Sequence, residues 1–427
     1  MAGKFKIIVS DLHLGAGFAE AGNALEDFTQ DAKLAQFLNG VSDESDAEGT
    51  ECELILAGDI MEFLQVPSLN EFNPTKAYPV EDYRSSSEED SLKRVNLIIA
   101  GHPVFFAALR DFLNAANPLR RATIIKGNHD VNLHWMAVQD RIREAVGATG
   151  EQEALLTFEE RCINREGVYI EHGNQYAEKI NRFDDFEEPH NPADEDQLVL
   201  VPGSRFVIGF FNDVERERYW IDGVKPITSL IWYGFAFDFS FAVKALVGFL
   251  KAALPLFLGS LTLKETPTPS KTDKPGRTLE DLRDVQDLGI RKASAVTLAR
   301  REVAKVHSAL HQAAEVKSRE EGTRVVVFGH THVALSEPLE TGGLYLNTGT
   351  WVWLRDFSDE DEVAWRELFN HPEKFTKDRR LTYARIDYDE EGQPWGQLIE
   401  LGSKPSVKGS PDDEVVGLQS SASSMRL

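Results

Sequence analysis

Side chains that bind metal ions recur at five places along the chain. Each place is a short segment in which aspartate, asparagine or histidine follows an apolar run: SDLHLG at 10–15, AGDIMEF at 57–63, KGNHD at 126–130, EHGNQ at 171–175 and FGHTH at 328–332. Carboxylate oxygen, amide oxygen and imidazole nitrogen together suit divalent ions such as Mn, Fe, Zn or Co. The candidate metal ligands in these segments are Asp11, His13, Asp59, Asn128, His172, His330 and His332.

A predicted strand precedes each of these segments. The apolar runs that open 4–15, 53–59, 122–130, 167–174 and 323–332 are rich in Val, Ile and Leu and end in glycine or polar residues. Helix-like stretches around 23–40 and 94–116 lie between the first strands, and this alternation predicts an α/β core. In open α/β sheets, ligands bind beyond the carboxyl ends of the strands, so the polar segments are expected to meet at one edge. Two charged stretches, 42–51 and 81–90, are predicted to be surface loops.

The chain is predicted to consist of a core interrupted by an insertion. Residues 1–185 and 301–402 form the two parts of the core, residues 186–300 form a largely helical, apolar insertion, and residues 403–427 are a Ser/Asp/Gly-rich tail without predicted structure. Within the insertion, residues 227–263 are very apolar, but charged residues and a proline interrupt them before the ~18 residues of a membrane span. One hypothesis is that this segment covers the site for an acyl or prenyl chain or rests on a membrane surface. The alternative is a buried helical hairpin or a dimer contact.

The composition limits which partners and which cellular compartment are expected. The 427 residues include 46 Lys and Arg against 70 Asp and Glu, and a net charge of -24 repels a polyanion, so nucleic acid is not an expected partner. Cys52 and Cys162 lack metal-ligand spacing and suit a reducing compartment. The first residues lack the apolar region and cleavage site of a signal peptide, so a cytoplasmic protein is predicted, with membrane association only through 227–263. The sequence predicts no oligomeric state.

Taken in order, the five motifs resemble those of the calcineurin-like metallophosphoesterase superfamily: Asp-x-His, Gly-Asp, Gly-Asn-His-Asp/Glu, a single His, and Gly-His-x-His. The resemblance spans residues 10 to 332 and implies a four-layer αββα β-sandwich flanked by helices. It also implies two sets of metal ligands that share Asp59 as a bridge. One set is Asp11, His13, Asp59 and His332, and the other is Asp59, Asn128, His172 and His330.

The resemblance implies hydrolysis of a phosphate ester or pyrophosphate bond by a hydroxide that bridges the two ions. His129 stands where family members carry the group that protonates the leaving oxygen or stabilises the transition state. Glu62, three residues after Asp59, is expected to orient His129, with Asp130 as the alternative. The other histidines are expected to have ordinary surface or core roles: His102, His134, His190, His307, His311 and His371.

Three hypotheses remain for the function. SDLHLG, the glycine after His172 and FGHTH are similar to the branch that contains UDP-2,3-diacylglucosamine pyrophosphatases, although that branch commonly has Arg where this chain has His129. An amphiphilic, lipid-linked phosphate is therefore one hypothesis. A soluble nucleotide or cyclic-nucleotide phosphodiesterase is the second, with Trp351 and Trp353 as stacking surfaces. The third is a non-catalytic scaffold of the same fold, which would be expected to lack some of the ligands.

Overall fold

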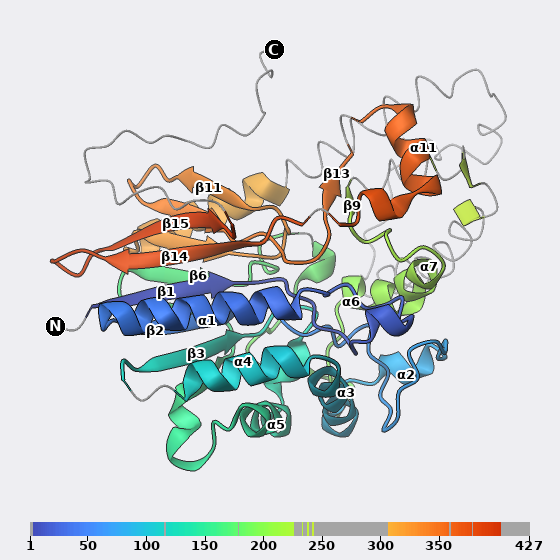
Figure 1. Ribbon diagram of the computed structural model, residues 1–427, viewed down its shortest axis with the longest axis horizontal. Coiled ribbons are helices and arrows are strands. Elements are labelled where there is room, and N and C mark those ends of the chain that lie inside the picture. The colour runs from blue at the N-terminus through green and yellow to red at the C-terminus, as the bar shows by residue number, and fades with distance from the viewer. Residues whose placement is uncertain are drawn as a thin grey trace, which may run out of the picture.

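The computed structural model describes residues 3–114, 117–177, 179–225, 233, 237–238, 241–242, 306–357, 360–377 and 379–402. This part of the chain has a mixed α/β architecture with two large sheets (Figure 1). The first sheet has the strand order β15-β14-β1-β2-β3-β4 and the second has the order β11-β12-β10-β6-β5. The α/β class predicted from the sequence is therefore confirmed.

The first sheet is parallel in its centre. Parallel pairing joins β1 (Lys4–Val9), β2 (Glu51–Ala57), β3 (Arg120–Ile125) and β4 (Leu156–Glu159), and β14 (Thr382–Tyr388) and β15 (Pro394–Glu400) add antiparallel strands at the β1 edge. Because three parallel strands end on the same side, the loops after β1, β2 and β3 leave the sheet together.

The second sheet carries the remaining two motifs. Its strands are β5 (Cys162–Arg165), β6 (Val168–Glu171), β10 (Val325–Phe328), β11 (Leu335–Pro338) and β12 (Leu344–Asn347), with β6, β10 and β12 parallel. The loops that follow β6 and β10 contain EHGNQ and FGHTH. All five predicted strands are thus present as β1, β2, β3, β6 and β10.

Alternate strand residues point to different cores. Ile8 and Ile55 of the first sheet form one buried cluster with Ile170 and Val327 of the second, so the two sheets pack face to face. The opposite face of the first sheet is covered by four helices (Figure 1): α1 (Asp31–Glu48), α3 (Glu88–Gly101), α4 (Pro103–Leu113) and α5 (Met136–Val146). Leu310, from a helix that covers 306–321, packs on the outer face of the second sheet.

Two loop expectations and one helix expectation need correction. The acidic stretch 42–51 is mostly helix and not a loop, because α1 continues to Glu48. The helix ends at Gly49, whose φ of 62° suits glycine. Val41 and Ser45 are buried one turn apart and keep this segment packed on the core. The stretch 81–90 contains α2 (Glu81–Arg84) and the start of α3, with Ser87 as the N-cap. The helix predicted for 94–116 is broken between α3 and α4, where Pro103 opens a new helix at an angle of 88°.

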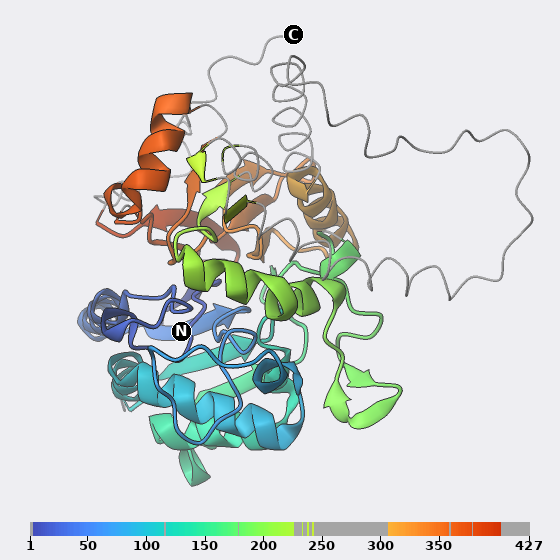
Figure 2. The ribbon, with the colours of Figure 1, turned by 90° about the vertical axis from the view of Figure 1, so that its right-hand side faces the viewer.

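Part of the predicted insertion is described. It contains the hairpin of β7 (His190–Asn191) and β8 (Asp194–Leu198), then α6 (Pro202–Phe206), a π-helical turn (Val207–Phe211) and α7 (Asn212–Glu217). Short β9 (Val224–Lys225) pairs with β13 (Arg355–Asp356), close to α11 (Glu362–Asn370). In Figure 2 the run from α6 to α7, in light green, lies between the helices of the first sheet and α11.

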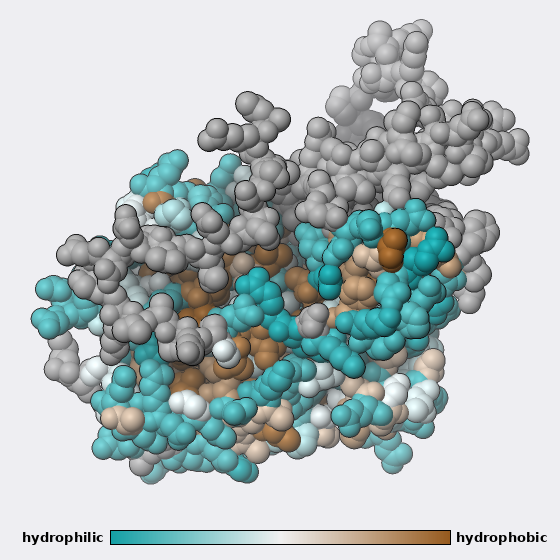
Figure 3. Space-filling model, turned by 45° about the horizontal axis from the view of Figure 1, so that its top comes forward, coloured by the Kyte–Doolittle hydropathy of each residue, from teal (hydrophilic) through white to brown (hydrophobic). Residues whose placement is uncertain are grey.

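The prediction of membrane contact through 227–263 falls mostly outside the described residues, as does the predicted tail 403–427. Among the few described residues of the apolar segment, Tyr233 stacks on Trp365 with ring centroids 4.5 Å apart, and Phe241 belongs to the same buried cluster. Within the described chain no single helix is long and apolar enough to cross a membrane, and one bent pair, α3 with α4, passes that test by length and composition. The face in Figure 3 is mostly hydrophilic, with hydrophobic residues gathered near its centre.

Candidate metal centre

Three of the five candidate loops share an unusual backbone conformation. Five of the seven candidate ligands have positive φ values between 50° and 68°, a region that non-glycine residues seldom occupy: Asp11, His13, Asp59, His330 and His332. Aspartate and histidine tolerate this conformation better than branched residues do, and strained residues of this kind cluster at functional sites. The turn it produces directs side chains from successive strand ends toward one point.

Backbone hydrogen bonds hold the first two loops in register. The N–H of Asp11 donates to the carbonyl of Gly58 (3.0 Å) and the N–H of His13 donates to the carbonyl of Asp59 (3.0 Å). The third loop joins them through the N–H of His129, which donates to Oδ1 of Asp59 at 2.8 Å. The three motifs of the first sheet are therefore tied together through main-chain groups.

Two glycines of the motifs are needed because other groups approach them closely. A Cβ on Gly127 would lie 2.2 Å from Oδ1 of Asp59, and a Cβ on Gly58 would lie 2.5 Å from the ring of His172. Any side chain at these positions would push the neighbouring ligand away. The glycines in AGDIMEF and KGNHD thus make room for the ligands.

Three of the four residues expected to hold one ion lie close together. Asp11, His13 and His332 have ligand atoms within 4.8 Å of one another. Nε2 of His13 lies 3.1 Å from Nε2 of His332, which in turn lies 3.3 Å from Oδ1 of Asp11. Nδ1 of His13 is engaged by Glu62 at 2.8 Å, which leaves Nε2 as the atom directed to the centre.

The second group comes together beside the first. Asp59, His172 and His330 also have ligand atoms within 4.8 Å of one another. Nε2 of His172 lies 3.1 Å from Oδ2 of Asp59 but lacks the angle of a hydrogen bond, and Nδ1 of His172 contacts the carbonyl of Ala57 at 3.1 Å. The buried carboxamide oxygen of Asn128 has no hydrogen-bond partner in the described part of the chain.

These donors fit a pair of divalent ions. A buried imidazole nitrogen beside a carboxylate and a buried amide oxygen without a donor are both groups that a cation would satisfy, and unpaired buried polar atoms are otherwise costly. Burial alone raises the pKa of Asp59, yet the charges of His172 and His129 hold it well below its ordinary value. Burial lowers the pKa of His172, but Asp59 outweighs burial and raises it to about 9. The low pKa of Asp59 and the raised pKa of His172 both show that positive charge is favoured beside the Asp59 carboxylate.

Glu62 orients two histidines at once. Its Oε2 lies 2.6 Å from Nδ1 of His129 and 2.8 Å from Nδ1 of His13, while the N–H of Leu64 donates to Oε1 at 3.0 Å. Burial opposes ionisation of Glu62, but the His129 charge and both hydrogen bonds lower its pKa to about 2. Burial lowers the pKa of His129, whereas Glu62 and Asp59 raise it to about 10. Its side chain keeps 22% exposure, so His129 faces an accessible space.

Asp130, the alternative partner for His129, has a different role. Its Oδ1 accepts from the N–H of Gly127 at 2.5 Å and its Oδ2 accepts from the N–H of Ile60 at 2.8 Å. Burial, together with the charge of Asp59, raises its pKa to about 6. Asp130 therefore joins the second and third loops instead of contacting the His129 ring.

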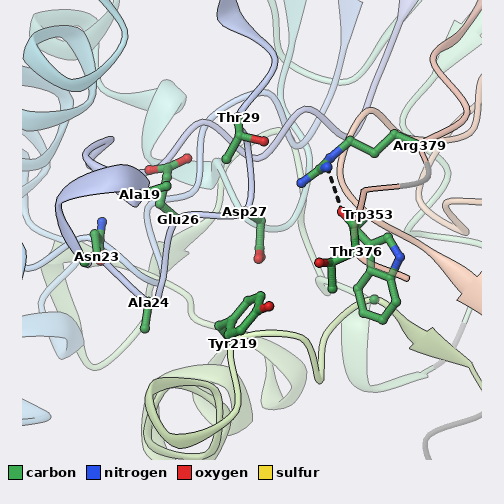
Figure 4. A pocket seen from close by; sticks show the side chains of 12 residues that line it. Ala19, Asn23, Ala24, Glu26, Asp27, Thr29, Tyr219, Trp353, Thr376 and Arg379 are labelled. Carbon is green, nitrogen blue, oxygen red and sulfur yellow. Dashed lines mark hydrogen bonds between the residues drawn. The ribbon is translucent and has the colours of Figure 1, made fainter. Parts of the chain in front are cut away.

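A cavity of about 360 Å³ is lined by the early loop 19–29, by part of the insertion and by residues between 353 and 379 (Figure 4). Asp27 projects into it between Tyr219 and Arg379, and Trp353 forms part of its wall. Asp27 also belongs to a group of three carboxylates, with buried Glu215 and Asp222, whose oxygens lie within 4.8 Å of one another. Sequence reasoning missed this group, because its members lie in an early loop and in the insertion and carry no motif.

The two tryptophans suggested as stacking surfaces differ. Trp351 is fully buried, packs against Phe37 and donates its indole N–H to the carbonyl of Thr382 at 2.8 Å, so it is a core residue. Trp353 alone of the two lines the cavity.

Comparison with known proteins leaves the family open: no family model matches the chain, and no curated protein matches it significantly.

Proposed function

We propose that the protein is a metal-dependent phosphoesterase of the calcineurin-like metallophosphoesterase superfamily, which hydrolyses a phosphate ester or pyrophosphate bond at a centre of two divalent ions. One observation carries the proposal. Two groups of ligand atoms, Asp11 with His13 and His332, and Asp59 with His172 and His330, lie within 4.8 Å inside each group and come from four of the five motif loops. The packing of helices, two sheets and a helix agrees with the αββα sandwich of that superfamily.

The residues suggest a division of labour. Asp11, His13, Asp59 and His332 would hold one ion, and Asp59, Asn128, His172 and His330 the other. Two divalent ions bound there would activate water as the nucleophile and polarise the phosphoryl oxygens.

His129 is proposed to act on the leaving group. Because Glu62 holds its Nδ1 at 2.6 Å, the Nε2–H is the group that remains to donate a proton or a hydrogen bond to the leaving oxygen. Glu62 is a positioning residue, since it contacts both His129 and His13 and is itself buried. The partial exposure of His129 leaves room for a substrate.

The test uses purified full-length protein stripped of metal by chelation and then reloaded separately with Mn, Fe, Zn or Co. Hydrolysis of p-nitrophenyl phosphate, bis-p-nitrophenyl phosphate, nucleotides and lipid pyrophosphates is measured before and after reloading. We expect turnover of at least one ester or pyrophosphate only in the reloaded protein, with about two ions per chain bound at this centre. Full turnover in the stripped protein, or none with any ion, would reject the proposal and favour the non-catalytic scaffold.

A nucleotide phosphodiesterase is the second candidate, and Trp353 is the observation that favours it. Its indole lines the cavity beside Asp27 and Arg379, where a base could stack. Trp353→Leu should raise KM for nucleotide substrates and leave KM for p-nitrophenyl phosphate unchanged. An equal effect on both would remove the support that Trp353 gives to this candidate.

A lipid-linked phosphate remains part of the proposal. The apolar segment 227–263 on which it depends falls mostly outside the described residues. The lipid pyrophosphates of the panel test it directly.

A further inference from the structure

We infer that His134, His190 and Glu188 form a separate zinc site on the surface of the protein, distinct from the proposed two-ion centre. Nε2 of His134 lies 3.2 Å from Nε2 of His190, and Oε2 of Glu188 lies 3.8 Å from Nε2 of His134. The three ligand atoms are all within 4.8 Å of one another. None of the three residues belongs to the five motifs.

The outer nitrogens of both rings are already occupied. Nδ1 of His190 lies 3.0 Å from the carbonyl oxygen of Glu195, which can only accept a hydrogen bond. Nδ1 of His134 lies 3.1 Å from Oε2 of Glu160, another acceptor. A hydrogen bond from Nδ1–H to a carbonyl or carboxylate is the arrangement that orients a metal-binding histidine and leaves its Nε2 lone pair for the ion.

Lys126 does not reverse this assignment. Its Nζ is 3.4 Å from Nδ1 of His134, farther than the Glu160 oxygen, and it also donates to the carbonyl of Glu187 at 3.3 Å and pairs with Glu160. Nδ1 of His134 is therefore best assigned as the donor to Glu160.

Two Nε2 lone pairs that face each other at 3.2 Å repel unless a metal ion or a proton lies between them. Nitrogens bound to one tetrahedral zinc at about 2.0–2.1 Å are about 3.3 Å apart, which is close to the distance observed. Oε2 of Glu188 lies 3.8 Å from Nε2 of His134, and because this side chain is 73% exposed it is free to move closer to the ion. A site of two imidazoles and one carboxylate suits zinc, with water as the fourth ligand.

The site joins two parts of the chain. His134 ends the 3-10 turn Val131–His134, directly after KGNHD, whereas His190 begins the hairpin of β7 and β8. Zinc would therefore fasten the hairpin to the segment that follows Asn128 and His129. The ion is expected to stabilise this connection and not to take part in hydrolysis.

The experiment measures zinc stoichiometry by equilibrium dialysis and elemental analysis on the full-length protein. The wild type is compared with His190→Gln and with His371→Gln, a matched control whose side chain is 52% exposed and lies outside every candidate group. We expect His190→Gln to bind one zinc fewer than the wild type, and His371→Gln to bind the same number. Equal numbers in all three would overturn the inference and leave a proton shared between the rings as the explanation.

A second variant guards against misfolding. Glu188→Gln changes an exposed side chain and should weaken zinc binding at this site at least about tenfold while circular dichroism stays unchanged. In wild-type protein, zinc should slow hydrogen exchange in residues 186–198, and His190→Gln should abolish that protection. Protection that persists in His190→Gln would also overturn the inference. Hydrolysis by the two-ion centre should be unaffected in either variant, which separates this result from a failure of the proposed function.

Discussion

The molecule contains two pairs of histidines that face each other through their Nε2 atoms. In the interior, His13 and His332 are 3.1 Å apart; near the surface, His134 and His190 are 3.2 Å apart. In both pairs a carboxylate or carbonyl engages the Nδ1 of at least one ring. The local geometry is thus nearly the same in the two places.

The surroundings of the pairs differ. The interior pair lies beside the fully buried Asp11 and Asp59, in loops that follow strands of two packed sheets. The surface pair has one exposed carboxylate, Glu188, and lies between a short turn and a small hairpin. Two ions with a shared carboxylate can carry out hydrolysis, whereas one ion between surface groups serves to connect them. The difference teaches that the carboxylates and the frame around a histidine pair, more than the pair itself, decide what it does.

The sharpest way to separate the two sites is to remove the shared carboxylate. Asp59→Asn should lower kcat/KM by more than about 10⁴-fold, beyond what the loss of a single acid-base group costs, because both ions of the centre lose an anionic ligand. Elemental analysis should show the loss of centre ions while the surface zinc stays bound. Full activity in this variant would contradict the assignment of Asp59.

His129→Ala tests the group beside the ligands. The variant should keep both ions of the centre and lose about 10²- to 10⁴-fold in kcat, because a positioned acid is removed but no ligand is. The p-nitrophenolate leaving group of p-nitrophenyl phosphate needs no protonation. The loss in kcat should therefore be smaller with this substrate than with an alkyl ester. Equal losses on both substrates would count against a proton-donating role.

Glu62→Gln should have a smaller effect, about 10- to 100-fold on kcat/KM, because Glu62 acts through His13 and His129. Metal affinity should fall as well, since the His13 ring loses its orientation. The conservative variant Glu62→Asp keeps the carboxylate and serves as the control. It should keep more of the activity than Glu62→Gln does. Unchanged metal affinity in Glu62→Gln would show that His13 is held by other contacts.

His102 provides a histidine that faces carboxylates on both sides and has no imidazole partner. Its Nδ1 lies 3.0 Å from Oδ1 of Asp31 and its Nε2 lies 3.4 Å from Oε1 of Glu26. Burial lowers its pKa, but these carboxylates outweigh burial and raise it to about 9. His102 should therefore bind no metal and instead stabilise the fold as a cation.

Because the folded pKa lies above the ordinary 6.5, this contribution is fully present below pH 6.5 and disappears as the pH rises through about 9. Urea unfolding of wild type and His102→Gln should differ by about 3 kcal/mol more at pH 6 than at pH 10. A difference that does not change with pH would mean that His102 stabilises the fold by packing alone.

Several features could be predicted from the sequence because they are local. The apolar runs before the five motifs identify β1, β2, β3, β6 and β10, since a buried strand needs a continuous apolar segment. The residue types of the five motifs and their resemblance to a known family selected seven ligand candidates, and six of these lie in two close groups in the structure. The resemblance also pointed to Glu62, which contacts the His129 ring in the structure.

Other expectations failed where tertiary packing outweighs composition. The end of α1 is rich in acidic residues, which is typical of a surface loop. Val41 and Ser45 are nevertheless buried and keep this part of the helix packed on the core. The pattern of 94–116 indicates one helix, but Pro103 breaks it and α4 turns away to cover the sheet. Trp351 and Trp353 look equivalent in sequence and both are buried, and only the fold decides that Trp353, and not Trp351, lines the cavity.

The sequence by itself determined the strands, the glycines and the ligand types, because each depends on neighbouring residues and on the chemistry of a side chain. Only the tertiary structure decided which distant groups meet. His134 and His190 are 56 residues apart and carry no shared pattern, and Asp27, Glu215 and Asp222 are likewise scattered. Such contacts arise when separate elements pack on a common core, so their distances are set by the fold and not by spacing along the chain.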